Sequence, residues 1–444
     1  MARARIAVVG LWHLGSVAAA ALAELGHQVR ATDLDARAVE RLAQGIPPVE
    51  EPGLGALLAR QIEQGRLAFP SSPRDAFAEA EFIFLTFDTP VDEADHSDLG
   101  PVFTAGDAIA LHALDGVEVV VMSQVPVGTC HNLAERIRAR APKLDFRIVY
   151  HPENLRLGQA IETFLRPDFL LVGAENDADA ERLLGLYNGV EAPRLKMSLR
   201  SAELSKHALN AFLATSVSFS NELAALAEAC GADIRDTLRA LRHDRRIGPH
   251  AFLSPGPGFS GGTLARDVQA LRTLGERARR ATPLLDAAWA VNRERLPGLV
   301  EKIRQACGTL RGLRVGLLGL TYKPGTDTLR RSAALELAEL LRGAGCAVQA
   351  FDPRIRQPRP ETRDIPLCAD AYEAARDTDA LVVMTPWPEF QQLDLARLRA
   401  AMRQPVLLDA HNLLDDSAAR RAGWRYFGTG VPQAAARAGA GAGQ

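Results

Sequence analysis

A glycine-rich loop past the middle of the chain carries side chains with obvious chemical capacity. Residues 255–267 read PGPGFSGGTLARD. Two Pro-Gly pairs followed by Ser-Gly-Gly predict a tight loop whose backbone can approach a ligand closely. The loop offers Ser260, Thr263, Arg266 and Asp267. It offers no cysteine, and whether that absence matters depends on the rest of the chain.

A second glycine-containing turn suggests a cofactor site. Its six residues are Gly10, Leu11, Trp12, His13, Leu14 and Gly15. The dinucleotide fingerprint is GxGxxG, and here Trp12 replaces the middle glycine, which lets the backbone approach a pyrophosphate. The indole must therefore point away from the phosphates or displace them. About 20 residues further on, Asp33 ends the next predicted strand, where a carboxylate would hold ribose hydroxyls. An acidic residue there favours NAD over NADP, because a 2′-phosphate would be repelled.

The elements around this turn alternate between strand and helix. Residues 3–10 form an apolar run typical of a buried parallel strand, followed by a predicted helix over 16–26 and a strand over 27–33. Further strands are expected at 80–87, 117–123, 146–152 and 169–174. Such alternation predicts a doubly wound parallel sheet.

Helical patterning then takes over from Ser198 to Gln305, and the strand–helix alternation restarts at Leu313. The sequence thus predicts an α/β protein with two Rossmann-like, doubly wound parallel-sheet domains joined by a central helical segment. The expected boundaries are 1–197, 198–305 and 306–431, followed by a low-complexity tail, 432–444, that we expect to be disordered. A crevice between two such domains is a common place for a ligand.

Composition narrows the classes of function. A chain of 444 residues predicts two or three domains. The net charge of -2 gives no electrostatic attraction to nucleic acid or to anionic membranes. No apolar run reaches the roughly 18 residues needed to cross a bilayer. The basic and apolar N-terminus resembles a signal peptide, but it continues directly into a strand of the same domain.

The cysteines and histidines argue against a disulfide framework and a metal site. The five cysteines are scattered, odd in number and without CxxC spacing. They predict reduced thiols in a cytoplasmic protein. The ten histidines form no HxxxH or HExxH pattern, so we expect no protein-bound metal.

Several segments occur in an order and at a spacing that resemble one enzyme family across almost the whole chain. They are IPPVEEPGLGALL (46–58), SQVPVGT (123–129), HPENLRLGQAIETFLRPDFLLVG (151–173), AELSKHALNAFLA (202–214), RIGPHAFLSPGPGFSGGTLARD (246–267) and GLTYKPGTDTLRRSAALELAELL (319–341). The chain is thereby identified as a member of the UDP-glucose/GDP-mannose dehydrogenase family.

The resemblance implies a fold and a chemistry. Members of this family oxidise the C6 alcohol of a nucleotide sugar to a carboxylate and reduce two NAD. Their N-terminal domain binds NAD, their C-terminal domain binds the nucleotide, and the central helix builds a homodimer. A cysteine adds to the intermediate aldehyde, and the thioester formed by the second hydride transfer is hydrolysed.

The opening loop departs from the family at this cysteine. An ungapped alignment places Thr263 at its position, and a slip of one residue would place Leu264 there. A threonine hydroxyl needs an adjacent base to attack, and its product would be an oxygen ester, a poorer electrophile than a thioester. We therefore expect an altered second oxidation.

Other family positions are mixed. Lys206 and Asn210 match the family and lie four residues apart on one helix face, where ammonium and amide can stabilise a developing oxyanion. Asp267 matches an aspartate that helps to activate water, and Glu153 matches the first glutamate of the family's PEFLRE. The second of those glutamates is Leu157 here, and Gln124 replaces a threonine that holds a water.

The resemblance assigns the remaining site residues by position. The catalytic residues are Lys206, Asn210, Asp267, Glu153 and Thr263. The cofactor-binding residues are Gly10, Trp12, His13, Leu14, Gly15, Asp33, Thr89, Pro90, Gln124 and Arg330. The substrate-binding residues are Glu153, Leu155, Lys206, Phe252, Phe259, Gly261 and Lys323. His411 stands where the family has arginine, so nucleotide contacts can differ.

Three functions stay open on the sequence. The first is an NAD-dependent nucleotide-sugar dehydrogenase that removes one hydride, giving an aldehyde or, from another alcohol, a ketone. The second is full oxidation to a sugar uronate without a thiol, for example through a hydrated aldehyde. The third is a non-catalytic binding paralogue whose Trp12 blocks the pyrophosphate, although Asp33, Lys206, Asn210 and Asp267 together argue against such decay.

Overall fold

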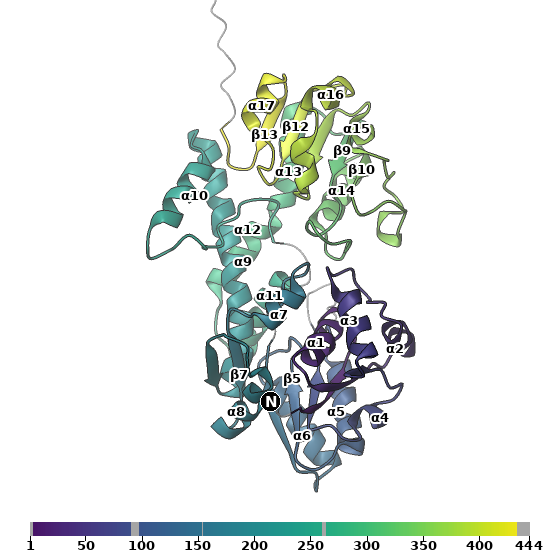
Figure 1. Cartoon of the computed structure of the whole chain (residues 1–444). Helices are drawn as coiled ribbons and strands as arrows, with labels where there is room; N and C mark the ends of the chain where they lie inside the picture. Colours follow the sequence, from purple (N-terminus) through teal and green to yellow (C-terminus); the bar gives the residue numbers. More distant parts are fainter. Residues whose placement is uncertain (1–2, 90–96, 153, 260–262, 433–444) are drawn as a thin grey trace, which may run out of the picture. The chain divides into compact units, whose positions relative to one another are not determined.

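The computed structural model describes residues 3–89, 97–152, 154–259 and 263–432 (Figure 1). It divides into two compact units, residues 1–209 with 269–274, and residues 210–268 with 275–444. The predictions made for Pro90, Glu153, Gly261 and the tail from 433 lie outside the described residues. The three-part division of the chain into domains stays a prediction.

The first unit alternates strands and helices. Its strands are β1 (Arg5–Val9), β2 (Gln28–Thr32), β3 (Leu67–Ala68), β4 (Phe82–Leu85), β5 (Val117–Val121), β6 (Phe146–Tyr150), β7 (Leu170–Gly173) and β8 (Arg194–Met197). Its helices are α1 (His13–Glu24), α2 (Ala36–Ala43), α3 (Leu54–Glu63), α4 (Pro73–Phe77), α5 (Gly100–His112), α6 (Thr129–Arg140), α7 (Ala160–Leu165), α8 (Asp177–Leu184) and the short η1 (Gly185–Tyr187).

In the described residues, the strands of this unit form one sheet in the order β3-β2-β1-β4-β5-β6-β7-β8. The first six follow the strand order of a dinucleotide-binding fold, whose crevice lies at the carboxyl ends of the central strands. Pairing is parallel from β3 to β6, whereas β7 joins β6 antiparallel. The predicted parallel sheet is thus confirmed for its dinucleotide-binding part, and it becomes mixed at β7.

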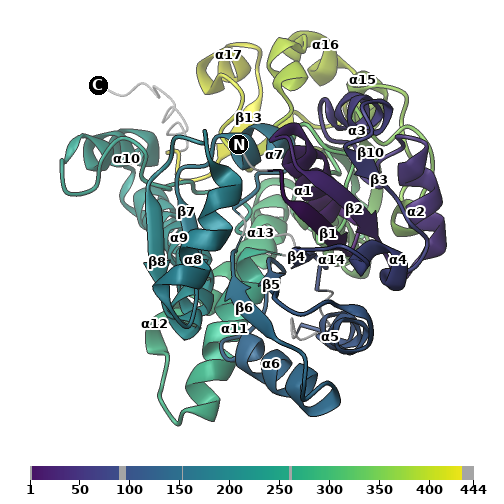
Figure 2. The same cartoon turned by 60° about the horizontal axis from the view of Figure 1, so that its bottom comes forward.

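Helices cover both faces of this sheet because alternate residues of its strands point to opposite sides. Ile6 and Val8 of β1 pack into the core beneath α1, α3, α7 and α8. Ala7 and Val9 pack into the other core, with α4, α5 and α6 (Figure 2). Every residue of α1 from 14 to 23 is buried, and its run of alanines allows close packing on the sheet.

Among the described residues, the second unit begins, along the chain, with five helices. They are α9 (Leu199–Cys230), α10 (Ile234–His243), α11 (Leu264–Arg277), α12 (Pro283–Arg293) and α13 (Arg295–Cys307), of which α9 and α11 extend into both units. The alternating part contains β9 (Arg314–Leu318), α14 (Ala333–Gly343), β10 (Ala347–Phe351), η2 (Pro360–Thr362), α15 (Ala371–Ala375), β11 (Ala380–Val383), η3 (Pro388–Gln392), α16 (Leu395–Ala400), β12 (Val406–Asp409), α17 (Asp416–Arg421) and β13 (Arg425–Gly428).

The strands described in the second unit pair in parallel in the order β10-β9-β11-β12-β13. This is the other common doubly wound order. Helices α13 and α14 pack on one face and α15, α16 and α17 on the other. The predicted second parallel-sheet domain is therefore confirmed.

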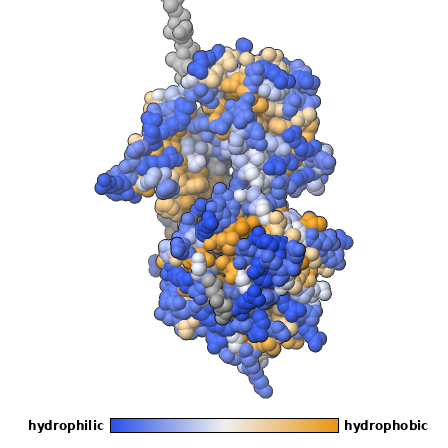
Figure 3. Space-filling view, viewed as in Figure 1, coloured by the Kyte–Doolittle hydropathy of each residue, from blue (hydrophilic) through white to orange (hydrophobic). Residues whose placement is uncertain are grey.

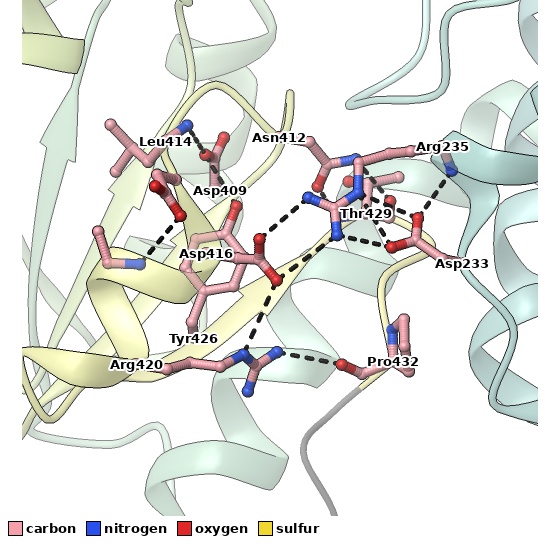
Figure 4. A network of polar contacts seen from close by, with 12 residues as sticks. Asp233, Arg235, Asp409, Asn412, Leu414, Asp416, Arg420, Tyr426, Thr429 and Pro432 are labelled. Atoms are coloured by element: carbon pink, nitrogen blue, oxygen red, sulfur yellow. Dashed lines mark hydrogen bonds and ion pairs between the residues drawn. The ribbon is translucent and has the colours of Figure 1, made fainter. Parts of the chain in front are cut away.

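Polar contacts fasten α10 to this second sheet (Figure 4). Arg235 bonds to Asp233, the N-cap of α10, and reaches Asp416 at the start of α17, with 3.1 Å between Nη1 and Oδ1. The backbone N–H of Ile234 donates to the carbonyl of Gly430 at 2.9 Å. These contacts join the helical segment to β13 and its neighbours within the second unit.

No helix in the described ranges is both long and apolar enough to span a membrane. On the face drawn in Figure 3, hydrophilic side chains cover most of the surface and apolar ones gather in patches.

Candidate active site

Two glycines of the turn after β1 are required by the backbone. Gly10 has a φ of +99°, a conformation that side chains disfavour. At Gly15 an added Cβ would lie 1.7 Å from the carbonyl oxygen of Gly10, so no side chain fits there. The first and third positions of the predicted fingerprint therefore have the roles that the dinucleotide motif gives them, a tight turn and close helix–strand packing.

The middle position does not require glycine. Trp12 has a φ of -78° and is the N-cap residue of α1, a conformation that any residue can adopt. Its side chain is 42% exposed. It lines a cavity of about 270 Å³ at the carboxyl end of β1, together with Gly10, Leu11, Asp33, Phe87 and Asp88. The indole is thus a wall of the groove in which a dinucleotide would lie.

Asp33 lies at the end of β2, as predicted, and is partly buried. Its carboxylate accepts a hydrogen bond from the N–H of Leu11 and another, of 2.9 Å, from the N–H of Asp35. A carboxylate here can accept hydrogen bonds from the hydroxyls of the adenosine ribose of NAD. The neighbouring N-terminus of α1 suits the negatively charged pyrophosphate.

The two residues between Trp12 and Gly15 have different environments. Leu14 is buried in the core that α1 forms with β1 and its neighbours. The imidazole of His13 donates from Nε2 to Oε2 of Glu51 over 2.8 Å. The same carboxylate accepts the N–H groups of Gly158 and Ala160, each at 2.9 Å. Burial works against charge on Glu51, but these hydrogen bonds outweigh it and lower the pKa of the carboxyl.

The loop after β5 is held by α9. Glu203 accepts the N–H groups of Gly128 and Cys130, at 2.5 and 2.9 Å. His207 Nε2 lies 2.8 Å from the carbonyl oxygen of Val125. Within this loop, the carbonyl of Gln124 accepts the hydroxyl of Thr89 at 2.8 Å, so the structure brings these two predicted cofactor residues together.

Lys206, on the same helix as Glu203, is buried in the first unit. Its ammonium donates to Oδ1 of Asn154, 3.3 Å away. The following residue, Leu155, lines a cavity of about 350 Å³ together with His151 and Tyr187. The structure therefore brings together Lys206 and the loop that carries the predicted substrate contact Leu155.

Asn210 and Asp267 meet in the second unit. Both are buried, and the side-chain amide of Asn210 donates to the carboxylate of Asp267. Thr263 lies directly before α11, where its carbonyl accepts the N–H of Asp267 at 3.1 Å, and the residue is exposed. Lys206 and Asn210 lie one turn apart on α9, so they face the same side of that helix.

The loop that precedes Thr263 is fixed by residues that the sequence did not single out. Asn221 of α9 accepts the N–H of Gly256 at 2.8 Å, and Arg295 donates to its carbonyl at 3.0 Å. Asn292 accepts the N–H of Phe259 at 2.7 Å and donates to its carbonyl at 3.1 Å. Phe259 also packs near the ring of Trp289, and Phe252 is 45% exposed.

Lys323 and Arg330, predicted to reach substrate and cofactor, belong to the loop between β9 and α14 of the second unit. Neighbouring Asp327 binds Arg359, with 2.9 Å between its Oδ2 and Nη2. His411, at the family's arginine position, lies 3.1 Å from the Met384 carbonyl through Nε2. Burial lowers the pKa of His411. The roles of Lys323 and Arg330 stay predictions.

Among the described residues, no group of three or more His, Cys, Asp or Glu side chains is arranged to hold a metal ion. The partners that sequence reasoning missed are Glu51, Glu203, His207, Asn221, Asn292 and Arg295. Glu51, Glu203 and His207 lie inside the quoted motifs, which was the signal for them, whereas Asn221, Asn292 and Arg295 lie outside every quoted motif.

Three domains of one known family match most of the chain. Residues 4–191 match the NAD binding domain of the UDP-glucose/GDP-mannose dehydrogenase family, residues 200–294 match its central domain, and residues 316–416 match its UDP binding domain.

Individual relatives agree with these matches. A UDP-glucose 6-dehydrogenase from Rhizobium meliloti is 35% identical over 96% of this chain and all of its own length. One from Pseudomonas aeruginosa is 36% identical over 97% of this chain and 98% of its own. The solved structure of a UDP-glucose dehydrogenase from Pyrobaculum islandicum superimposes with a TM-score of 0.89 at 34% identity, covering 97% of this chain and 98% of that one.

Proposed function

Because the chain belongs to the UDP-glucose/GDP-mannose dehydrogenase family, and so is an NAD-dependent dehydrogenase acting on a CH–OH group, we propose that it oxidises a nucleotide-linked sugar by a single two-electron step. The UDP binding domain supports a nucleotide-sugar substrate. UDP-glucose is the first candidate, because it is the substrate named for the two relatives above.

The observation that carries this proposal is the absence of a thiol from the loop before α11. No cysteine lies between Cys230 and Cys307 in the sequence, and Thr263 stands at the family's nucleophile position. Four of the five thiols in the chain are poor substitutes, because burial raises the pKa of Cys130, Cys307, Cys346 and Cys368. A neutral thiol is a weak nucleophile.

A single hydride transfer needs no thiol. In that step the carbinol carbon loses a hydride to NAD and the hydroxyl loses its proton to solvent water. We assign Lys206 and Asn210 to stabilise the oxygen as negative charge develops on it. Asp267 accepts a hydrogen bond from the side-chain amide of Asn210, which fixes the orientation of that amide and leaves its second N–H to donate to the reacting oxygen. The product is an aldehyde or a ketone.

The test is the number of NADH molecules formed per UDP-glucose consumed, with hydroxylamine present to trap a carbonyl product. We expect one NADH and one trapped carbonyl for each sugar. Two NADH and a uronate would contradict the proposal and favour the four-electron reaction of the named relatives. Failure to bind NAD would leave a non-catalytic binding protein.

Variants at Thr263 sharpen this test. Thr263→Cys restores a thiol and should raise the yield toward two NADH per sugar. Thr263→Ser is the matched control, because it keeps a hydroxyl and should stay at one. If both variants stay at one, the changes at Gln124 and Leu157 also limit the second oxidation, and a combined revertant is the next protein to assay.

We further propose that the enzyme is a homodimer assembled through α9. Phe212, Phe219 and Leu226 are 70%, 50% and 58% exposed and lie seven residues apart, which places them in one stripe along the helix. An exposed apolar stripe of this kind marks an interaction surface. Light scattering should give twice the chain mass, and Phe212→Ser with Phe219→Ser should halve it. A monomeric parent protein would refute this.

We assign the enzyme to the cytoplasm. All five cysteines are free, and exposed Cys230 has no disulfide partner in the described residues. Free thiols suit a reducing compartment. Fractionation of the native host should place it in the soluble, non-periplasmic fraction.

A further inference from the structure

One buried carboxylate, that of Glu51, lies between the cofactor turn and the loop before α7. It accepts hydrogen bonds from His13, the first residue of α1, and from the backbone of Gly158 and Ala160. Glu51 and its donors come from three separate segments of the first unit, and each contact is 2.8 or 2.9 Å long. Glu51 therefore joins the turn that binds a pyrophosphate to a loop more than 100 residues away in the sequence.

The contact is shielded from water. The side chain of Glu51 is fully buried and that of His13 is 13% exposed. Next to it, Gly53 lies against Ile161 of α7, where an added Cβ would be 3.8 Å from its Cδ1. In such surroundings a hydrogen-bonded carboxylate resists displacement, because leaving it would strand buried N–H groups.

The loop that Glu51 holds also carries a contact to the proposed oxyanion residue. Asn154 accepts from the ammonium of Lys206 at 3.3 Å, four residues before Gly158. A short path therefore runs from the start of α1, through His13, Glu51 and the loop 154–160, to Lys206. Every described residue on it belongs to the first unit.

We propose that Glu51 is a positioning residue through which an occupied dinucleotide cavity fixes the loop 154–160 and, with it, the place of Lys206. A pyrophosphate bound to the N-terminal turn of α1 orders His13, which orders the carboxylate and the two backbone N–H groups it accepts. The role of Lys206 in this statement rests on the proposed function, whereas the ordering of the loop by NADH does not.

Hydrogen exchange of the full-length protein tests the ordering directly. NADH at saturating concentration should slow exchange in peptides that cover 154–160 by about tenfold, within the usual range of coupling between two sites. Glu51→Gln should raise exchange there without NADH and remove most of the effect of NADH, because an amide cannot accept three donors. Glu63→Gln, an exposed residue at the end of α3, is the control and should behave as the parent protein.

A second variant separates positioning from simple support of the loop. His13→Phe leaves the bonds from Glu51 to Gly158 and Ala160 in place. It should therefore keep the basal protection of the loop but lose the additional protection caused by NADH. If His13→Phe responds to NADH as the parent protein does, Glu51 only supports the fold and the proposal is overturned. It is overturned equally if the parent protein binds NADH without any change in 154–160.

Binding measurements with UDP-glucose as the probe give an independent readout. In the parent protein, NADH should tighten UDP-glucose about tenfold, and in Glu51→Gln the ratio of dissociation constants with and without NADH should fall to near one. A merely structural loss would weaken both constants and leave their ratio unchanged. If UDP-glucose is not a ligand at all, the proposed substrate fails, and the exchange experiment alone decides the role of Glu51.

Discussion

The two sheets of the molecule share one turn, with a glycine after the first strand and an aspartate after the second, but the two aspartates have different surroundings. In each, the first strand ends at a glycine with positive φ, Gly10 at +99° and Gly319 at +91°, and the second strand is followed by an aspartate. Gly10 donates to Thr32 at 3.1 Å and Gly319 to Phe351 at 2.8 Å. The backbones of the two turns are therefore built alike.

The aspartates differ in what surrounds them. Asp33 is partly exposed and lines the 270 Å³ cavity. Asp352 is fully buried, and its Oδ2 accepts from Leu320, twice from Thr321, and from the indole N–H of Trp387, at 2.7 to 3.1 Å. The carboxylate of Asp33 thus lies at a cavity, where a ligand could reach it, whereas that of Asp352 is occupied by hydrogen bonds inside the fold. The residues that cover the glycine–aspartate turn therefore decide whether its carboxylate is accessible.

Removing Asp352 is expected to have the largest effect. Asp352→Ala leaves several buried donors without an acceptor, which should lower the free energy of unfolding of the second unit by at least about 3 kcal/mol. The dissociation constant of NADH should stay within twofold, because the cavity belongs to the other unit. Urea denaturation and NADH titration measure the two quantities.

The control for this variant is Asp364→Ala, an exposed carboxylate with ion pairs only, which should cost less than about 0.5 kcal/mol. Loss of NADH binding by a folded Asp352→Ala protein would show that the covered turn contributes to the cofactor site after all.

Replacing a buried carboxylate of the first unit, that of Glu118, is expected to have the opposite effect and to stabilise the protein. Glu118 of β5 is fully buried; neither oxygen has a hydrogen-bond donor in the described residues, and Arg182 lies 3.5 Å away. Desolvation raises the pKa of Glu118 from 4.5 to about 7. Because the folded protein holds this proton more tightly, its contribution to stability is present below pH 4.5 and is lost as pH rises through 7.

Glu118→Gln should therefore stabilise the protein above pH 7 by at most about 3 kcal/mol relative to the parent protein, and by progressively less toward pH 5. Thermal unfolding across this pH range measures the difference. Exposed Glu79→Gln should show no such pH dependence. A constant difference at every pH would mean that Arg182 keeps Glu118 ionised.

Asp33→Asn should weaken NAD roughly tenfold, because a charged acceptor for the ribose hydroxyls is lost. It should also narrow the preference for NAD over NADP, since no carboxylate repels the 2′-phosphate. The melting temperature should change little. Asp35→Asn, two residues on and capping α2, is the control and should bind NAD normally. Equal NAD affinity in both variants would remove Asp33 from the cofactor site.

Trp12→Gly is expected to have the smallest effect, tightening NAD by about threefold, roughly 0.6 kcal/mol, through closer approach of the backbone to the pyrophosphate. Isothermal titration with NAD measures it. Weaker binding in Trp12→Gly would show instead that the indole packs on the cofactor and replaces the missing glycine.

The sequence predicted the elements with strong patterns and missed those without them. Apolar runs located β1, β4 and β5 within a few residues, and the fold class followed from their alternation with helices. β8 was missed because it has only four residues, RLKM, which are mostly exposed, and β3 is only two residues long. The strand β7 was predicted, at 169–174, but its antiparallel pairing with β6 was not, because apolar runs do not encode strand direction.

The site was predictable only where a motif names its residues. The motifs located Asn210 and Asp267, and the structure brings them into contact. They did not indicate Asn292, which holds Phe259 from 33 positions away, or Glu51, which holds Gly158 from 107 positions away. Such contacts are made by tertiary packing and leave no periodic trace in one sequence.

The position of Trp12 gives this enzyme a built-in optical reporter. The chain has four tryptophans, and Trp387 and Trp424 are buried in the second unit. Only the indole of Trp12 lines the described 270 Å³ cavity. Reduced nicotinamide absorbs where indole emits, so excitation of the protein should transfer energy to bound NADH. If NADH binds in this cavity, the residue that breaks the glycine fingerprint would allow cofactor arrival to be timed in a stopped-flow instrument, with no label attached.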